Sequence, residues 1–269
     1  MQSKFDNKIK AVTRQVVLKQ YLKFAKPIFK KNEDLTAYTL PADMWTLEQQ
    51  MVDHALYYTK TKSELNLTCF ECDPATYKHN TDSRYFMLNG NELHTRLNFE
   101  YKFDFMHRNL HAKKNFFMWA DFCGCPTQER LDMVLNKKNL VANSLIFVTF
   151  ACRWRNCYTI PKTIVDIRDD LFAHDLNPRK SSSHHASNAI QSYMHPLMKP
   201  FGFRPIVNLE YIANQGGGAT SMCVLGFSNS STLNCTKFLR KTLNWFKGAV
   251  SSEVREVQNY LDIQACLNH

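Results

Sequence analysis

The segment NFFMWADFCGCPTQERLDMVLNKKNLVANSLIFVTFACR, from Asn115 to Arg153, decides the fold class of this chain. An apolar run ends in Asp121, a turn follows, then an amphipathic helix, and a second apolar run closes the segment. Two buried parallel strands joined by a crossover helix give this pattern, because strands buried on both faces read as near-continuous apolar runs. Ligands of open α/β sheets bind beyond the carboxyl ends of the strands, where the pattern places Asp121 and the turn after it.

Length and composition indicate one folded domain with helical ends. The chain has 269 residues, of which 44% are hydrophobic and 22% charged, as in ordinary globular proteins. We divide it into a basic N-terminal helical extension (1–34), an α/β domain (35–234) and a C-terminal helical tail packed on that domain (235–269).

The net charge and the cysteine content indicate which partners and which cellular compartment suit the protein. The 34 Lys and Arg outnumber the 24 Asp and Glu, giving a net charge of +10 that favours polyanions such as nucleic acid. Nine cysteines, several within apolar runs, suit a reducing compartment better than a disulfide framework. Without a long apolar run or a signal sequence after Met1, we expect a soluble cytoplasmic protein with no membrane partner.

The first part of the chain predicts a helix followed by a β-α-β unit. Residues 8–31 place apolar side chains at helical spacing between Lys and Arg, up to a stop or kink near Pro27. A strand over 36–40, a turn and a helix from about Trp45 come next, and the strand Leu65–Asp73 ends in acidic residues. An acid at the tip of the second strand of such a unit binds ribose hydroxyls in nucleotide-binding folds.

The rest of the chain predicts further secondary-structure elements from weaker residue patterns. We expect a strand over Arg84–Leu88, a helix over 97–114 from its apolar spacing, irregular structure over Trp154–Lys180 and a loop over Ser181–Ser187. A helix from Ala186 to about Met198 precedes a terminal antiparallel hairpin. Its strands are Phe203–Ala213 and Thr220–Phe227, joined by a short glycine-rich turn.

This order resembles that of the class I S-adenosylmethionine-dependent methyltransferases, and most closely a divergent group carried by viruses and plasmids. The residues that carry the resemblance are Leu40-Pro41-Ala42, Glu71 with Asp73, Asn89-Gly90-Asn91, Asp121-Phe122-Cys123-Gly124, and Thr149-Phe150 with Arg153. The resemblance covers about residues 35–230. It implies a Rossmann-like, mostly parallel seven-stranded sheet with helices on both faces and a C-terminal antiparallel hairpin, and S-adenosyl-L-methionine as cofactor.

The resemblance also implies roles for individual residues. The expected cofactor-binding residues are Leu40, Pro41, Ala42, Glu71, Asp73, Asn91, Glu92, Cys123 and Gly124. Arg153 and Arg155 are expected to bind the substrate. Ala42 stands where the group has glycine, and Ala allows fewer backbone conformations, which tightens the turn. The motif after the fourth strand matches neither of the two common DNA-methyltransferase patterns, so the acceptor atom stays open.

Chemistry points to Asp121 and Phe122 as the catalytic pair. Methyl transfer needs the acceptor atom held in line with the methyl group, and the Asp121 carboxylate can orient an amine or hydroxyl by accepting its hydrogen bond. Phe122 can stack on a flat acceptor such as an unpaired base. We expect Cys123 to be a small packing residue, His184 and His185 to lie at the surface, and no metal site, because no ligand spacing of a known kind is present.

Three functions remain open from the sequence. The first is a methyltransferase acting on DNA or RNA, with the acceptor positioned by Asp121. The second is a catalytically inactive domain of the same fold that binds nucleic acid or a protein partner. A methyltransferase for a small molecule is the third, and its activity would depend little on salt. The sequence does not determine the oligomeric state.

Overall fold

A computed structural model describes residues 8–40, 46–57, 63–71, 73–78, 81, 97–103, 113–122, 124–141, 143–154, 158–175, 182–215, 218–233 and 237–243. The strands form one sheet: β1 (Leu35–Thr39), β2 (Leu65–Glu71), β3 (Leu97–Phe103), β4 (Phe116–Asp121), β5 (Ser144–Ala151), β6 (Arg204–Gln215), β7 (Gly218–Ser228) and β8 (Leu239–Leu243). Their order across the sheet is β3-β2-β1-β4-β5-β7-β6-β8.

The first five strands are parallel, and only β7 runs against its neighbours. β1 pairs in parallel with β2 and β4, which pair in turn with β3 and β5. β7 is antiparallel to both β5 and β6, and β8 is parallel to β6. The order 3-2-1-4-5 is that of doubly wound nucleotide-binding sheets. The predicted Rossmann-like α/β fold with its hairpin is therefore confirmed, with one strand more than the seven expected.

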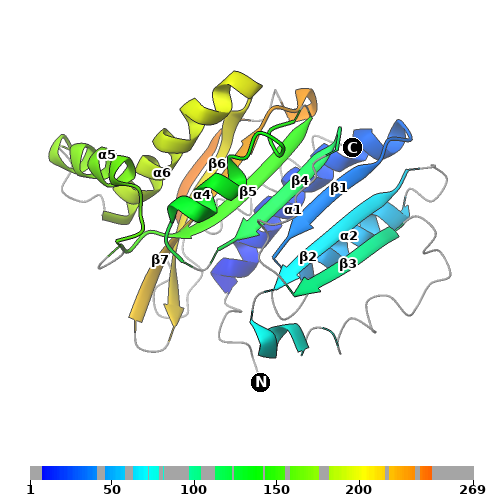
Figure 1. Cartoon of the computed structure of the whole chain (residues 1–269), viewed down its shortest axis with the longest axis horizontal. Helices are drawn as coiled ribbons and strands as arrows, with labels where there is room; N and C mark the ends of the chain where they lie inside the picture. Colours follow the sequence, from blue (N-terminus) through cyan, green and yellow to red (C-terminus); the bar gives the residue numbers. More distant parts are fainter. Residues whose placement is uncertain are drawn as a thin grey trace.

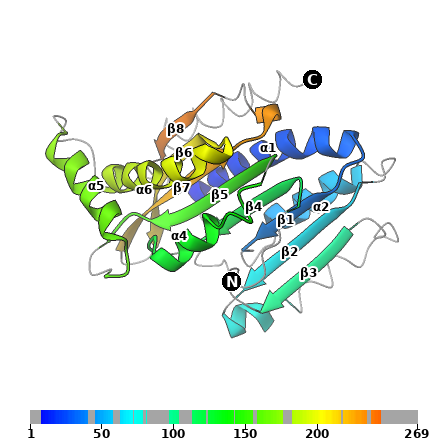
Figure 2. The same ribbon diagram turned by 45° about the horizontal axis from the view of Figure 1, so that its top comes forward.

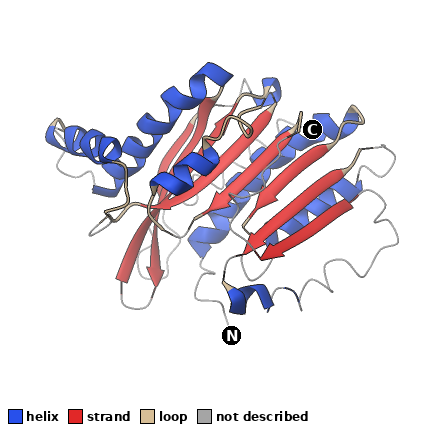
Figure 3. Cartoon of the chain, in the orientation of Figure 1, coloured by secondary structure: helices blue, strands red, loops and turns tan. Residues whose placement is uncertain are grey.

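Helices cover both faces of this sheet (Figures 1 and 3). They are α1 (Lys8–Lys30), α2 (Thr46–Tyr57), α4 (Gln128–Val134), α5 (Lys162–Ala173) and α6 (Ser182–Met198), with short 3₁₀ turns η2 (Lys199–Phe201) and η3 (Ser231–Leu233). One apolar core joins α1 and α2 to the sheet, and a second joins α4, α5 and α6 to its other face. No helix in the described part of the chain has both the length and the apolar character that a membrane crossing needs.

The elements that decide the fold class lie where their sequence predicts. All eight residues of β5 are buried, and so are the first five of β4, as expected for strands covered by helices on both faces. Thr127 is the N-cap of α4, and its hydroxyl accepts a hydrogen bond from the backbone N–H of Arg130 at 3.4 Å. β1, β2 and the β6–β7 hairpin also occupy the predicted segments, whereas the strand expected over Arg84–Leu88 lies outside the described residues.

Helix α1 belongs to the core, so the description of residues 1–34 as an extension is wrong for this helix. The side chains of Val16, Tyr21 and Phe24 are fully buried, and the Tyr21 ring meets the Phe117 ring of β4 edge-on with centroids 5.0 Å apart. These residues belong to the apolar face that the helical spacing over residues 8–31 predicts. That face covers the sheet beside α2.

Residues 97–103 form the edge strand β3, which corrects the helix predicted over 97–114 (Figure 2). Phe99 and Phe103 are four residues apart, which fits a helix, but apolar and polar residues alternate strictly over LNFEYKF, which fits a strand. The polar positions include Glu100 and Lys102, which form an ion pair at 2.8 Å. Charged side chains on an edge strand discourage pairing with other chains.

Three C-terminal predictions also need correction. Residues 162–173 of the segment expected to be irregular form α5, whose apolar side chains recur at helical spacing around the buried Ile164. Helix α6 starts at Ser182, so His184 and His185 lie on a helix and not in a loop. Within the tail predicted as helical, Leu239–Leu243 form β8, because the open edge of β6 offers backbone partners. Residues 244–269 lie outside the described part.

Candidate functional site

The carboxyl ends of the parallel strands meet at one edge of the sheet (Figure 1). Register places Thr39, the last residue of β1, between Cys69 and Trp119. Asp121, the last residue of β4, pairs with Thr149 of β5. Glu71 ends β2 one strand further out. The two acidic strand ends singled out from the sequence therefore lie at the same edge, two strands apart.

The sheet changes winding direction between β1 and β4. The chain leaves β1 toward α2, which packs on one face, and leaves β4 toward α4, which packs on the other. Loops that diverge from neighbouring strands open a crevice outside the strand ends, and this switch point is the usual ligand position in open α/β sheets. Leu40, Glu71 and the segment after Asp121 border that position.

Glu71 and Asp73 make different contacts at the end of β2. The half-buried Glu71 carboxylate accepts a hydrogen bond from the Asp73 backbone N–H at 2.8 Å, which orients it. The exposed Asp73 carboxylate accepts from the N–H groups of Ala75 at 3.2 Å and Thr76 at 3.4 Å, at the start of the helical turn 74–78. Asp73 therefore caps a helix. Glu71 is the better candidate for a ribose ligand.

Phe122 is half-buried and packs against the apolar core on the α4 side of the sheet. Its ring stacks on Phe150 of β5 with centroids 5.4 Å apart, and the Arg130 guanidinium lies 5.4 Å from its centroid. Arg130 also donates a hydrogen bond to the Cys125 carbonyl at 2.8 Å. These contacts hold the turn after β4 in place. Phe122 therefore has a packing role, and its stacking on an acceptor stays a prediction.

Gly124 makes the same turn compact. A Cβ atom at this position would collide with the guanidinium of Arg130, so a larger residue would displace that side chain. The Gly124 carbonyl accepts a hydrogen bond from the Ala151 N–H at 2.9 Å, which ties the turn to the end of β5. Leu40 is half-buried against the α4 side of the sheet, and Arg153 is exposed just beyond β5. The remaining predicted site residues lie outside the described part: Pro41, Ala42, Asn91, Glu92, Cys123 and Arg155.

Glu48 is a site residue that the sequence did not reveal. It lies in the first turn of α2 and is only 2% exposed. Burial raises the pKa of Glu48 above its ordinary value and the negative charge of Asp121 adds to this, while the Thr39 hydroxyl and Arg14 oppose it. Glu48 therefore adds a second, buried carboxyl group near Asp121, and a shifted pKa of this kind is common at functional sites. Its acidic position at a helix N-terminus is common, so no sequence signal set it apart.

We expect Glu48→Gln to change the pH dependence of stability. Because the folded-state pKa is raised, Glu48 stabilises the fold fully below its unfolded pKa, and this contribution is lost as pH rises through the folded pKa. The neutral variant should therefore gain stability relative to the natural protein as pH rises above the ordinary pKa of a glutamate, 4.5. Urea unfolding across this pH range measures the difference. Glu129→Gln, at an exposed position of α4, should follow the natural profile, and parallel profiles for all three proteins would contradict the assignment.

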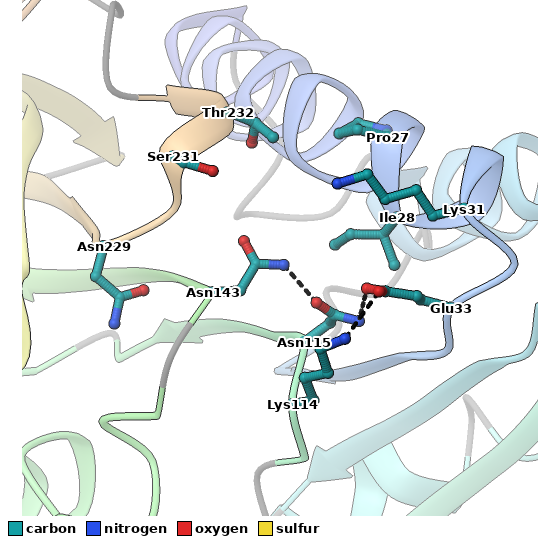
Figure 4. Close-up of a pocket in the computed structure, with 10 residues that line it drawn as sticks. All are labelled: Pro27, Ile28, Lys31, Glu33, Lys114, Asn115, Asn143, Asn229, Ser231 and Thr232. Atoms are coloured by element: carbon teal, nitrogen blue, oxygen red, sulfur yellow. Dashed lines mark hydrogen bonds and ion pairs between the residues drawn. The ribbon is translucent and has the colours of Figure 1, made fainter.

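A pocket of about 310 Å³ lies at the opposite edge of the sheet, where the parallel strands begin (Figure 4). Its polar side chains bond largely to one another: Asn115 donates to Glu33 at 3.1 Å, Asn143 donates to Asn115, and Lys114 pairs with Glu33 at 2.8 Å. Neighbouring Asn229 binds the backbone N–H that starts β5, at Ser144. This network ties strand starts together, so we interpret it as structural.

Comparisons with known proteins support no family assignment from sequence. No family model and no curated protein sequence match the chain. Among solved structures, it is similar to a Listeria monocytogenes protein assigned to the class I S-adenosylmethionine-dependent methyltransferases, with a TM-score of 0.43, 7% identity and coverage of 92% of this chain and 69% of the other. For a Haemophilus influenzae protein assigned as a methylase, the TM-score is 0.37 and the identity 11%, with coverage of 79% of this chain and 88% of the other. For the Streptomyces coelicolor geranyl diphosphate C-methyltransferase, the TM-score is 0.37 and the identity 9%, with coverage of 74% of this chain and 71% of the other. Similarity at this level is too low to carry an argument about function, which therefore depends on the chain's own geometry.

Proposed function

We propose that this chain is an S-adenosylmethionine-dependent methyltransferase whose acceptor is a nucleic acid. The observation that carries the proposal is the pair of acidic strand ends beside the switch point of the sheet, Glu71 after β2 and Asp121 after β4. The sequence resemblance assigns the same two positions to the cofactor and the acceptor. The basic net charge of +10 supports a polyanionic acceptor.

The described residues fit the cofactor at its ribose and along the turn after β4. The oriented carboxylate of Glu71 suits a pair of ribose hydroxyls, which donate hydrogen bonds to such a group at the tip of a second strand. Leu40 offers an apolar wall at the end of β1, and the compact turn at Gly124 brings backbone close to the crevice. When bound, S-adenosylmethionine supplies an electrophilic methyl group on a sulfonium sulfur.

The protein's own contribution is positioning. The Asp121 carboxylate accepts a hydrogen bond from an N–H or O–H of the acceptor and so orients the acceptor's lone pair. Glu48 is buried close enough to Asp121 for the two charges to interact, and burial, followed by the charge of Asp121, raises the pKa of Glu48. The aromatic stack of Phe122 on Phe150 keeps the turn that carries Asp121 rigid.

Cofactor binding is the direct test of this proposal. We expect isothermal titration calorimetry to show one S-adenosylmethionine site, and mass spectrometry of the purified protein to detect S-adenosylhomocysteine. Glu71→Gln should weaken binding about tenfold, because an ionised acceptor of the ribose hydroxyls becomes a neutral one. Glu129→Gln is the matched control and should bind as the natural protein does. Absence of heat at high micromolar cofactor would exclude the methyltransferase.

The alternative is a catalytically inactive domain of the same fold that binds nucleic acid. The replacement of glycine by Ala42 in the first turn of the cofactor region favours this alternative. It predicts oligonucleotide binding without cofactor binding. Anisotropy titration with labelled oligonucleotides, run beside the calorimetry, separates the two functions.

A further inference from the structure

A pocket of about 620 Å³ opens at the carboxyl end of β5, between that strand end and the helices α5 and α6. Its walls combine cationic, aromatic and buried polar side chains: Cys152, Arg153, Trp154, Arg168, Asp169, Phe172 and His185. The pocket borders the candidate site, because the Gly124 carbonyl is bonded to Ala151 and the Cys125 sulfur lies 4.0 Å from the Arg153 carbonyl. Its volume lies within the range of pockets that bind small molecules and cofactors.

Two arginines line the pocket, and the carboxylate of Asp169, which also lines it, offsets the charge of Arg168. Arg168 is held in one orientation, because its guanidinium lies 5.1 Å from the Trp154 ring centroid and donates to the Asp169 carboxylate at 2.7 and 2.9 Å. Trp154 is itself fixed by a 2.8 Å hydrogen bond from its indole N–H to the Ala151 carbonyl. Arg153 is exposed beside this rigid pair. An exposed guanidinium such as that of Arg153 suits a phosphate group.

An aromatic ring is exposed at the same opening. The side chain of Phe172 on α5 is 64% exposed, whereas Ile164 on the same helix is buried. Exposed aromatic rings beside basic residues are the platforms on which unpaired bases stack. The rings of Phe172 and His185 are nearly perpendicular, with centroids 5.5 Å apart.

A buried imidazole belongs to the lining of the pocket. His185 is 4% exposed, and its Nε2 lies 3.3 Å from a carboxylate oxygen of Asp175. The expectation that this histidine lies at the surface is therefore wrong. An imidazole has two ring nitrogens that can form hydrogen bonds, which suits the polar edge of a base better than an apolar ligand.

We propose that this pocket binds one unpaired nucleotide of a single-stranded nucleic acid, with the base against Phe172 and His185 and a flanking phosphate on Arg153. The base has to be unpaired, because the hydrogen-bonding edge that His185 would meet is occupied in a duplex. That the bound nucleotide is the methyl acceptor rests on the proposed function, whereas its binding does not. The arginines, the aromatic ring and the buried imidazole together fit a nucleotide better than an acidic peptide, which has no flat ring to stack.

Fluorescence anisotropy with the full chain and fluorescein-labelled single-stranded ten-mers of DNA and RNA tests this inference. Phe172→Ala and Arg153→Ala should each weaken binding about tenfold. Arg153→Ala should also reduce the slope of log affinity against log salt by about one. Tyr57→Ala, at a position 81% exposed on α2, and Lys138→Ala, at an exposed position after α4, are the matched aromatic and cationic controls, with expected changes below about twofold.

The outcomes distinguish this inference from the proposed function. If neither ten-mer binds, or if the pocket variants bind like their controls, the nucleotide pocket is excluded even when calorimetry shows S-adenosylmethionine binding. Competition by polyglutamate as effective as competition by unlabelled oligonucleotide would likewise exclude it, in favour of a general polyanion surface. Binding that depends on Phe172 and Arg153 in a protein without cofactor affinity supports the pocket and excludes the methyltransferase. Thermal unfolding of each variant verifies that it is folded.

Discussion

Substitution of Asp121 by Ala should lower methyl transfer about 100-fold or more while leaving S-adenosylmethionine affinity within about twofold. The carboxylate ends β4 beside the switch point, where it can accept a hydrogen bond from the acceptor, and a positioned acid or base contributes ~100–10,000-fold to a rate. Transfer of tritiated methyl groups to single-stranded DNA and RNA measures the rate, and calorimetry measures cofactor affinity.

Asp121→Asn separates two ways in which this residue can act. The Asn side chain still accepts a hydrogen bond but is a much weaker base, so it should keep part of the activity if Asp121 orients the acceptor and almost none if it takes the proton. Asp132→Asn, exposed on α4, is the control for loss of a negative charge. Full activity in Asp121→Ala with cofactor still bound would exclude a role for this residue in catalysis.

Phe24→Ala should destabilise the protein by about 3–5 kcal/mol, the usual cost of removing a fully buried phenylalanine. The ring belongs to the apolar core that joins α1 and α2 to the sheet. Total stabilities of ~5–15 kcal/mol make this a large fraction of the whole. The midpoint of urea unfolding, followed by tryptophan fluorescence, reports the loss.

Gln15→Ala on the same helix gives the control. Gln15 is exposed, so its replacement should change stability by less than about 0.5 kcal/mol. If Phe24→Ala left the main unfolding transition unchanged, α1 would be an appended helix that unfolds separately, as the basic character of the segment first indicated. The fully buried Val16 and Tyr21 lead us to expect one shared transition.

The sequence predicts best where one residue pattern has one physical explanation. The apolar runs at Phe116–Asp121 and Ser144–Ala151 are too short and too continuous for anything but buried strands, and both form as predicted. Residues 97–103 satisfy helical and strand spacing at once, and the unpaired edge of β2 decides for a strand. Local sequence contains no information about that edge, so the helix prediction failed there.

The candidate site divides in the same way. Glu71 and Asp121 could be found from the sequence, because a residue that ends a parallel strand necessarily lies at the carboxyl edge of the sheet. The role of Asp73 as a helix cap and the packing of Phe122 against Phe150 could not, because they depend on where the next segment turns. Glu48 was not singled out from the sequence and His185 was expected at the surface, because the sequence around a polar side chain does not show whether it is buried.

By itself, the sequence determined the α/β class, the order of most strands along the chain and the acidic ends of β2 and β4. Local residue patterns suffice for these features, because they show which strands are buried on both faces and which residue ends a strand. Only the tertiary structure decided that α1 is part of the core, that Glu48 lies beside Asp121 and that Arg153, Phe172 and His185 line one pocket. Each of these depends on contacts between residues far apart in the chain. Such contacts form only when the sheet brings its strand ends together.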